Sequence, residues 1–230
     1  MSSTTSLDRL KKLIMAAMFV AVAYVFRFIF HFNAMFLTFE FKDAVIAIGA
    51  MFLGPLWGVG IAIAVALLEF FTISMSTTGV YGLIMNILAA SVYAGVAGLV
   101  YKYKRTMTGA MWSLGAATAV LVAVMLPANL LITPYFMGAT VDAVIDLIPA
   151  LLFPFNLIKG VMNSGVVLLL YKPVTRALRG VKLADSAVVH KETGKASVNK
   201  WLVPLVACLL ILLSCLFFFL FLHGNISFGK

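Results

Sequence analysis

A lysine lies between two asparagines inside a long apolar segment of the second half of the chain. Asn156, Lys159 and Asn163 are three and four residues apart, so in a helix they share one face. A lysine at the centre of a bilayer costs about 2.5–3.5 kcal/mol, so it needs a compensating role. Gly160 beside it leaves room for another group to approach closely. This group of residues is the strongest candidate for a ligand site.

A structural role would explain the same residues. Lys159 could be neutralised by a buried carboxylate from Glu40, Asp43 or Glu69. The asparagines could then join helices by hydrogen bonds. The residues alone leave both interpretations open, with the ligand site slightly favoured.

Two further asparagines, Asn86 and Asn129, lie in other apolar segments and could face the same cavity. Carboxamides and an ammonium group together offer hydrogen-bond donors and acceptors. They suit a neutral molecule with polar edges better than a metal ion or a strong anion. The sequence contains no His, Cys, Asp and Glu cluster with metal-ligand spacing and no G-x-S-x-G nucleophile motif. We therefore expect a binding protein without a metal or other cofactor, and not an enzyme.

The composition is that of a membrane protein. Of the 230 residues, 63% are hydrophobic and only 11% are charged, whereas soluble domains carry about 25% charged residues. The net charge of +9 comes from basic residues between apolar runs. That arrangement indicates membrane topology rather than a nucleic-acid partner.

The apolar runs predict an all-α membrane protein, with a six-helix transmembrane bundle and a seventh C-terminal transmembrane helix. Gly54 and Pro55 divide one long run into two short helices, which could form a hairpin buried in protein. Alternation of polar and aromatic residues over 37–43 predicts an extended segment. The expected helices cover 13–30, 42–54, 56–72, 81–101, 109–132, 148–171 and 201–222.

The loop charges predict the orientation of these helices. Basic clusters at 9–12, 102–105 and 172–182 fall on one side if the Gly54–Pro55 break reverses the chain, and the acidic loop 135–146 falls on the other. The positive-inside rule then places the N-terminus in the cytoplasm. We expect a substrate-binding domain over 1–180, a polar cytoplasmic linker over 181–199, and the additional helix and tail over 200–230.

Two motifs resemble a known family. Asn129-Leu-Leu-Ile-Thr-Pro134-Tyr135 and Pro154-Phe155-Asn156-Leu-Ile-Lys159-Gly160 are similar to those of the riboflavin-specific S components (RibU type) of energy-coupling factor (ECF) transporters. Ala17 and Ala21 match the family's A-x-x-x-A motif. The resemblance covers about residues 8–180, so the linker and seventh helix are not part of it.

The resemblance implies a function in vitamin uptake. An S component of this kind binds riboflavin outside the cell membrane, and a transmembrane coupling subunit with two cytosolic ATPases drives import. Asn129, Asn156 and Lys159 would then bind the pyrimidine edge of the flavin, and the loop from Leu37 to Asp43 would contact the ribityl chain. Ala17 and Ala21 would face the coupling subunit. The full set of candidate substrate-binding residues is Asn86, Asn129, Asn156, Lys159, Asn163, Phe39, Glu40, Phe41 and Tyr135.

Three alternatives stay open at this point. The chain could be an S component for another flat vitamin, or a membrane interaction protein whose polar residues only pack helices. A carrier coupled to protons is a third alternative, which the lack of acidic residues in the fourth to sixth predicted helices disfavours.

Overall fold

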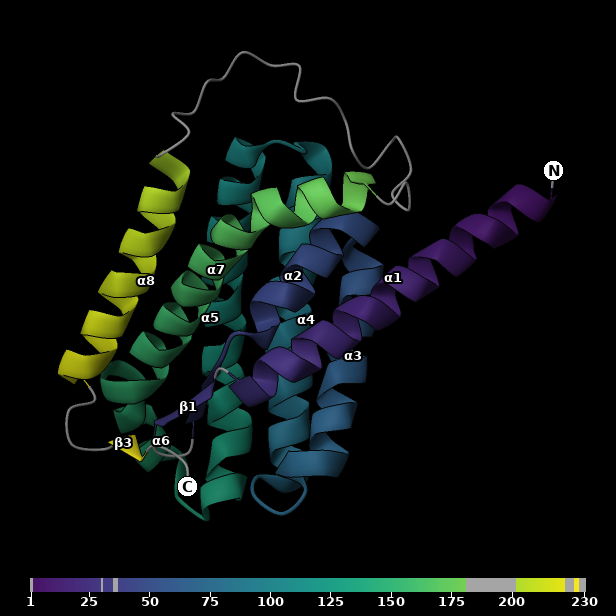
Figure 1. Ribbon diagram of the computed structural model, residues 1–230. Coiled ribbons are helices and arrows are strands. Elements are labelled where there is room, and N and C mark those ends of the chain that lie inside the picture. The colour runs from purple at the N-terminus through teal and green to yellow at the C-terminus, as the bar shows by residue number, and fades with distance from the viewer. Residues whose placement is uncertain (1, 30, 35–36, 181–201, 222–225, 228–230) are drawn as a thin grey trace.

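Long apolar helices make up most of the chain in the computed structural model, which describes residues 2–29, 31–34, 37–180, 202–221 and 226–227 (Figure 1). Among these residues, five helical stretches are long and apolar enough to cross a membrane: Leu7–Ile29, Pro55–Ser74, Gly79–Tyr103, Met107–Met137 and Val141–Ala177. The predicted all-α membrane class is therefore confirmed, although a count of six or seven crossing helices is not established by length and composition alone.

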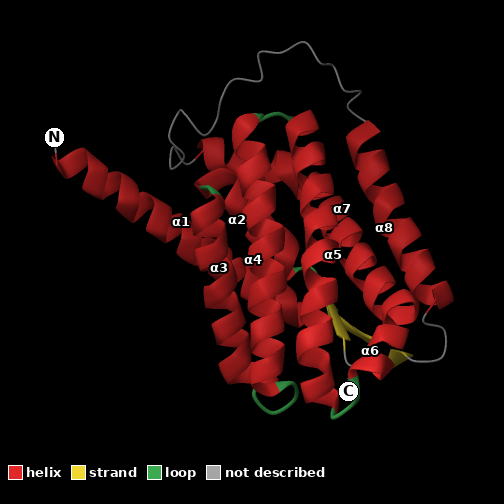
Figure 2. Ribbon diagram, turned by 180° about the vertical axis from the view of Figure 1, so that it is seen from behind, coloured by secondary structure: helices red, strands yellow, loops and turns green. Residues whose placement is uncertain are grey.

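The first helix, α1 (Ser2–Ile29), crosses the bundle obliquely, and its N-terminal half extends away from the other helices (Figures 1 and 2). Met15, Phe19 and Ala23 recur every four residues and are buried against the core. Ala17 and Ala21 lie on another face and are exposed. The helix thus buries one face against the bundle and leaves the face with Ala17 and Ala21 exposed.

The predicted break at Gly54 and Pro55 is confirmed. Helix α2 (Lys42–Leu53) ends at Gly54, whose φ of 107° is a conformation that favours glycine, and Pro55 begins α3 (Pro55–Glu69). Every residue of α2 is buried. At 12 residues, and about 1.5 Å of rise per residue, α2 is too short to cross a bilayer core of about 30 Å. Helix α2 is therefore short and buried in protein, as expected, whereas the stretch that follows the break, Pro55–Ser74, is 20 residues long and long enough to cross a membrane.

Three long helices complete the bundle around α2. A π-helical turn, η1 (Phe70–Ser74), extends α3 and leads to α4 (Gly79–Tyr103). Helix α5 (Met107–Met137) is followed by the short α6 (Val141–Leu147). A second π-helical turn, η2 (Ile148–Leu152), then enters α7 (Phe153–Gly180). The core joins residues of α1, α2, α3, α4, α5 and α7 in one apolar cluster, which also takes in Val203 and Ala207 of the C-terminal helix.

Helix α1 begins at Ser2 rather than near residue 13, and two other helices end later than the sequence-based expectation. Helix α5 does not stop at Thr133 but continues through Pro134 to Met137, where Gly138 ends it with φ 62° and an N–H donated to the Pro134 carbonyl. A proline near the end of a helix removes only the hydrogen bond of its own missing N–H, so the helix can continue. It ends where a glycine adopts the left-handed conformation. Helix α7 likewise continues past Tyr171 to Gly180.

A small sheet lies at one end of the bundle. Strands β1 (His31–Ala34) and β2 (Leu37–Glu40) form an antiparallel hairpin, with Phe32 opposite Phe39. Strand β3 (Ile226–Ser227), near the C-terminus, pairs with the other edge of β1. The expected extended segment is confirmed for 37–40, whereas Lys42 and Asp43 already belong to α2.

A helix is present where the seventh was predicted, α8 (Leu202–Phe221), and it runs along the outside of α7 (Figure 1). Its crossing of a membrane stays a prediction. The predicted linker over 181–199 lies outside the described residues. The division of the chain at 180 stays a prediction.

Helix α2 and helix α3 pack too closely to admit a side chain at Gly58. A Cβ there would lie 2.2 Å from Ala50 Cβ, whereas a Cβ at Gly60, on the exposed side of α3, would meet nothing within 4 Å. Gly58→Ala should therefore lower the free energy of unfolding by about 1–3 kcal/mol. Gly60→Ala is the matched control and should be neutral or slightly stabilising. Thermal unfolding in detergent measures both, and equal effects would contradict this packing.

Candidate functional site

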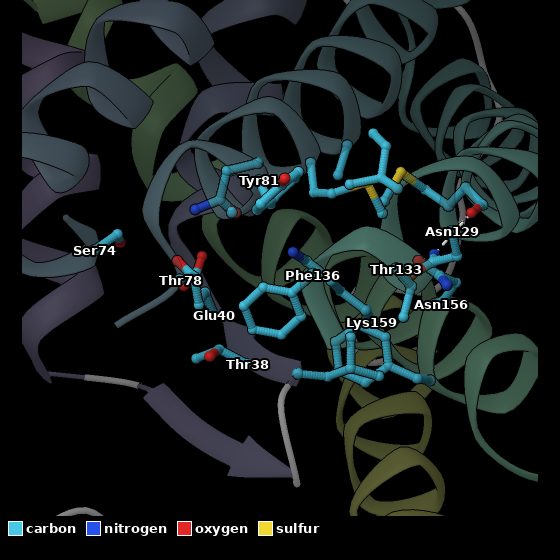
Figure 3. A pocket seen from close by; sticks show the side chains of 18 of the residues that line it. Thr38, Glu40, Ser74, Thr78, Tyr81, Asn129, Thr133, Phe136, Asn156 and Lys159 are labelled. Carbon is cyan, nitrogen blue, oxygen red and sulfur yellow. Dashed lines mark hydrogen bonds between the residues drawn. The ribbon is translucent and has the colours of Figure 1, made fainter. Parts of the chain in front are cut away.

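A pocket opens at the sheet end of the bundle, among β2, α4, α5 and α7 (Figure 3). The space inside it is about 900 Å³, a volume that includes open solvent at its mouth. Both apolar and polar side chains line it. They are Arg27, Leu37, Thr38, Glu40, Ser74, Thr77, Thr78, Tyr81, Gly82, Met85, Asn86, Ala89, Met125, Asn129, Ile132, Thr133, Phe136, Phe155, Asn156 and Lys159.

Carboxamides define one side of the pocket. Asn129, Thr133 and Asn156 gather on the same side of the close-up view (Figure 3). The amide of Asn129 donates to the Met125 carbonyl at 2.7 Å, and its oxygen accepts from the Thr133 hydroxyl at 3.0 Å. The amide of Asn156 donates to the Leu152 carbonyl at 2.8 Å. Each bond stays within the continuous helical stretch of its asparagine, so among the described residues neither side chain bonds to a different helix.

These local bonds leave hydrogen-bonding capacity facing the pocket. A carboxamide has two N–H donors and an oxygen with two lone pairs. Among the described residues, the Asn156 side chain makes only its bond to Leu152, so its oxygen and one N–H are left for a ligand. Both asparagine side chains are buried, at 2% exposure each. A buried amide with unused donors or acceptors favours a ligand whose polar groups can bond to them.

Hydroxyl groups line the opposite side. Thr38 comes from β2, whereas Ser74 and Thr78 come from the connection between α3 and α4 (Figure 3). Phe136 lies between the two polar sides in this view. The pocket therefore offers amides at one side, hydroxyls at the other and an aromatic ring between them.

Six buried charged side chains lie in or beside the pocket. Arg27 Nε lies 2.9 Å from Glu40 Oε1 and 3.5 Å from Glu69 Oε1. Lys42 Nζ lies 2.5 Å from Glu40 Oε2 and also pairs with Glu69. A separate pair joins Lys159 Nζ to Asp43 Oδ2 at 3.0 Å.

The three cations and three carboxylates of this charge network balance, although all six side chains are buried. The network connects α1, β2, α2, α3 and α7. Burial alone raises the pKa of the Glu40 carboxyl, but the charges of Lys42, Lys159 and Arg27 outweigh that effect and lower this pKa to about 2. Glu40 is therefore a carboxylate at neutral pH, where Arg27 and Lys42 compensate it.

Asn86 connects the pocket to the network. Its amide donates to Glu69 Oε2 at 3.1 Å while its side chain lines the pocket. The pairing of Lys159 with Asp43 agrees with the structural explanation considered from the sequence, yet Lys159 also lines the pocket. The structural role of this lysine is therefore supported, whereas its contact with a ligand stays a prediction.

Asn163 lies outside the pocket and acts as a connector. Its amide donates to the Glu40 carbonyl at 3.1 Å and to the Lys159 carbonyl at 3.0 Å, and its oxygen accepts from the Ala44 N–H at 3.0 Å. These bonds join α7 to the point where β2 turns into α2. The expectation that Asn163 contacts substrate is not supported by this geometry, because its hydrogen bonds serve the backbone.

The predicted aromatic contacts also lie elsewhere. Phe39 is 1% exposed and packs on Phe155, with ring centroids 4.4 Å apart, while Phe41 packs against the same apolar cluster. Tyr135 is 76% exposed on the outside of α5. None of the three lines the pocket, whereas Thr38 and Glu40 of β2 do.

Comparison with known proteins identifies the family. Residues 11–171 match the family model of the ECF transporter substrate-specific component. The chain belongs to this family. It is therefore a transport component and a multi-pass membrane protein, not an enzyme, and the resemblance read from its motifs is confirmed.

Two known proteins are similar to this S component over most of its helical bundle. The riboflavin transporter RibU of Staphylococcus aureus (strain TCH60) is 28% identical over 180 residues, which are 74% of this chain and 94% of that protein. A solved structure described as the S component of a bacterial ECF transporter is 29% identical, with a TM-score of 0.63, over 74% of this chain and 99% of that one.

Several pocket residues of this S component were not predicted. Arg27 is the main one, and the sequence carried a signal for it: a charged residue inside an apolar helix is itself a reason to expect a function. The hydroxyls of Ser74, Thr77 and Thr78 lie between two apolar runs, where the sequence gives no reason to prefer them over an ordinary loop. Among the described residues, no group of three or more His, Cys, Asp and Glu side chains could hold a metal ion.

The Lys159–Asp43 pair should contribute to the stability of the ligand-free protein. Lys159→Met or Asp43→Asn alone leaves one buried charge without its partner, so each should lower the free energy of unfolding by about 3–5 kcal/mol. The double variant should lose clearly less free energy of unfolding than the sum of the losses in the two single variants. Lys172→Met, an exposed lysine on the same helix, is the control. Additive losses in denaturant unfolding would show that the two charges do not interact.

Proposed function

We propose that this S component binds riboflavin and supplies it to an ATP-driven importer. The observation that carries the proposal is the pair of buried carboxamides, Asn129 and Asn156, which both keep hydrogen-bonding capacity toward a pocket with an aromatic ring and hydroxyls. A flavin ring is flat and neutral, and its pyrimidine edge carries both donors and acceptors. The similarity to a riboflavin transporter supports the same ligand.

The proposed pose follows from the two sides of the pocket. The pyrimidine edge would meet Asn129, Asn156 and Lys159, and the flavin ring would lie beside Phe136. The ribityl chain would then extend toward the hydroxyls of Thr38 and Thr78 and toward Glu40. Each hydroxyl of a polyol needs a partner when water is removed, and this side of the pocket offers such partners.

The proposed orientation places the pocket outside and the N-terminus in the cytoplasm of the cell. The turn between α4 and α5 and the end of α7, both rich in basic residues, lie at the end of the bundle away from the sheet (Figure 1). Asp142 and Asp146 of α6 lie at the sheet end. If the basic residues face the cytoplasm, the six-helix domain would consist of α1, α2, α3, α4, α5 and α7. Helix α8 would cross the membrane as a seventh helix.

The proposed partners are a transmembrane coupling subunit and two cytosolic ATPases. Ala17 and Ala21 support the first of these, since they are exposed on α1 and small residues four apart let another helix approach closely. No cofactor is part of the proposal, because riboflavin would be the transported ligand.

Riboflavin binding can be tested on the purified protein. Protein prepared in detergent from cells grown with riboflavin should carry a yellow chromophore with quenched fluorescence, which denaturation releases. A colourless protein that also fails to quench added riboflavin would overturn the riboflavin assignment and leave another flat vitamin or no ligand.

Two carboxamide variants test the pose. Asn129→Leu and Asn156→Leu should each weaken riboflavin binding by about 1–3 kcal/mol, because a polar atom of the ligand is left without a partner. Tyr135→Leu, on the exposed side of α5, is the control and should bind as the wild type does. Isothermal titration of folded variants checks this. A membrane scaffold without a ligand would keep or gain stability in the leucine variants and show no binding in any of them.

Phosphorylated flavins should bind more weakly than riboflavin. Both cations that line the pocket already have a carboxylate partner, Arg27 in Glu40 and Lys159 in Asp43, and Lys42 is paired inside the network. A phosphate would have to take a cation from its carboxylate, which leaves that carboxylate buried and unpaired. Flavin mononucleotide that competes as well as riboflavin would contradict this prediction.

A further inference from the structure

The C-terminal segment returns to the pocket end of the bundle. Helix α8 runs antiparallel to α7, from the end that carries the basic residues to the end that carries the sheet (Figures 1 and 2). It lies beyond residue 171, where the family match ends. The S-component bundle thus carries an additional segment that extends to the pocket end.

The contact between α8 and α7 is close and specific. Ala207 is completely buried, and a Cβ at Gly165 of α7 would lie 2.8 Å from Ile211 Cγ1 and 3.2 Å from the Ala207 carbonyl oxygen. The hydroxyl of Ser214 donates to the Leu210 carbonyl of its own helix, so α8 needs no polar partner here. Small residues at the point of contact let two membrane helices pack tightly, so α8 is fixed on α7.

Beyond α8, strand β3 pairs with the pocket hairpin. Ser227 lies opposite Asn33, and Ile226 lies opposite Ala34, on the edge of β1 that β2 does not use. Strand β2, on the other side of β1, carries Thr38 and Glu40 into the pocket. The C-terminal strand is therefore one strand away from residues that line the site.

A two-stranded hairpin is marginally stable by itself, whereas a third strand makes a sheet markedly more stable. The hairpin is anchored at its inner end, where Asn163 and the charge network hold Glu40. Strand β3 pairs at the opposite end of the hairpin, with Asn33 and Ala34 at the end of β1. Because α8 is packed on α7, a pairing at this point connects the outer end of the hairpin to the bundle.

We propose that α8 and β3 form a strap that holds the β1–β2 hairpin against the pocket and slows the exchange of ligand. A ligand that enters past Thr38 and Glu40 requires the hairpin to move, and a paired third strand resists that movement. The effect on ligand exchange rests on the proposed riboflavin binding, whereas the effect on the hairpin does not.

Removal of the β3 backbone donors tests the strap in the full-length protein. The double variant Ile226→Pro with Ser227→Pro loses both amide hydrogens and cannot pair as a strand. The variant Ile226→Ala with Ser227→Ala is the matched control, since it keeps both amides. Hydrogen–deuterium exchange over residues 31–40, without ligand, reports on the hairpin. The dissociation rate of bound riboflavin, followed by recovery of its fluorescence, reports on the pocket.

The proline variant should accelerate both processes by about tenfold, as expected for the loss of one or two backbone hydrogen bonds, while the alanine control stays near the wild type. Unchanged hydrogen exchange over residues 31–40 would overturn the strap. Faster hydrogen exchange with an unchanged dissociation rate would overturn its role in ligand exchange. If the wild type binds no riboflavin, the proposed function fails, and the hydrogen exchange still decides whether the strap exists.

A second variant separates the strap from a local effect of proline. Ala207→Leu should displace α8, because Ala207 has no exposed surface and faces Gly165. Leu209→Ala, on the exposed side of α8, is its control. Faster hairpin exchange in Ala207→Leu but not in Leu209→Ala supports a strap made of α8 and β3 together, and equal exchange in both would contradict it.

Discussion

Neutrality of the buried charge network constrains the rest of this structure. Six ionisable side chains from five elements lie out of water, and each unpaired charge there would cost several kcal/mol. The positions of α1, β2, α2, α3 and α7 are therefore linked, because a shift of any one element would separate a cation from its carboxylate. The pocket lies beside this network and shares Arg27, Glu40 and Lys159 with it, so the shape of the binding site depends on the same balance.

The sequence was most informative where a single residue type determines the backbone. Gly54 with Pro55 divides two helices, and the alternation over 37–40 is a strand, as expected. It was least informative about where helices end: α5 continues through Pro134, since a proline near a helix end removes only one hydrogen bond. Long apolar runs reveal that a helix exists, whereas its last turn depends on the neighbours that cover it.

The site was predicted in part. Asn86, Asn129, Asn156, Lys159 and Glu40 were expected to meet, and the structure brings all five to one pocket. Asn163 shares the helix face of Lys159 but lies one turn further in, where it meets the backbone of Glu40 and Ala44. Helical spacing gives the face of a residue but not the depth at which a pocket ends. The hydroxyls between α3 and α4 depend on how two distant segments approach, which no local pattern records.

The order of synthesis gives the charge network a further consequence. Five of its members, Arg27, Glu40, Lys42, Asp43 and Glu69, belong to the first third of the chain and carry one more negative than positive charge. Lys159 restores neutrality only after about ninety further residues, which take several seconds at about 5–20 residues per second. During that interval Asp43 lacks Lys159, its ion-pair partner, and α2 is too short to cross a bilayer alone. The last helix of the pocket therefore supplies the charge that balances α2, and the ion pair that joins the two helices can form only after α7 has been made.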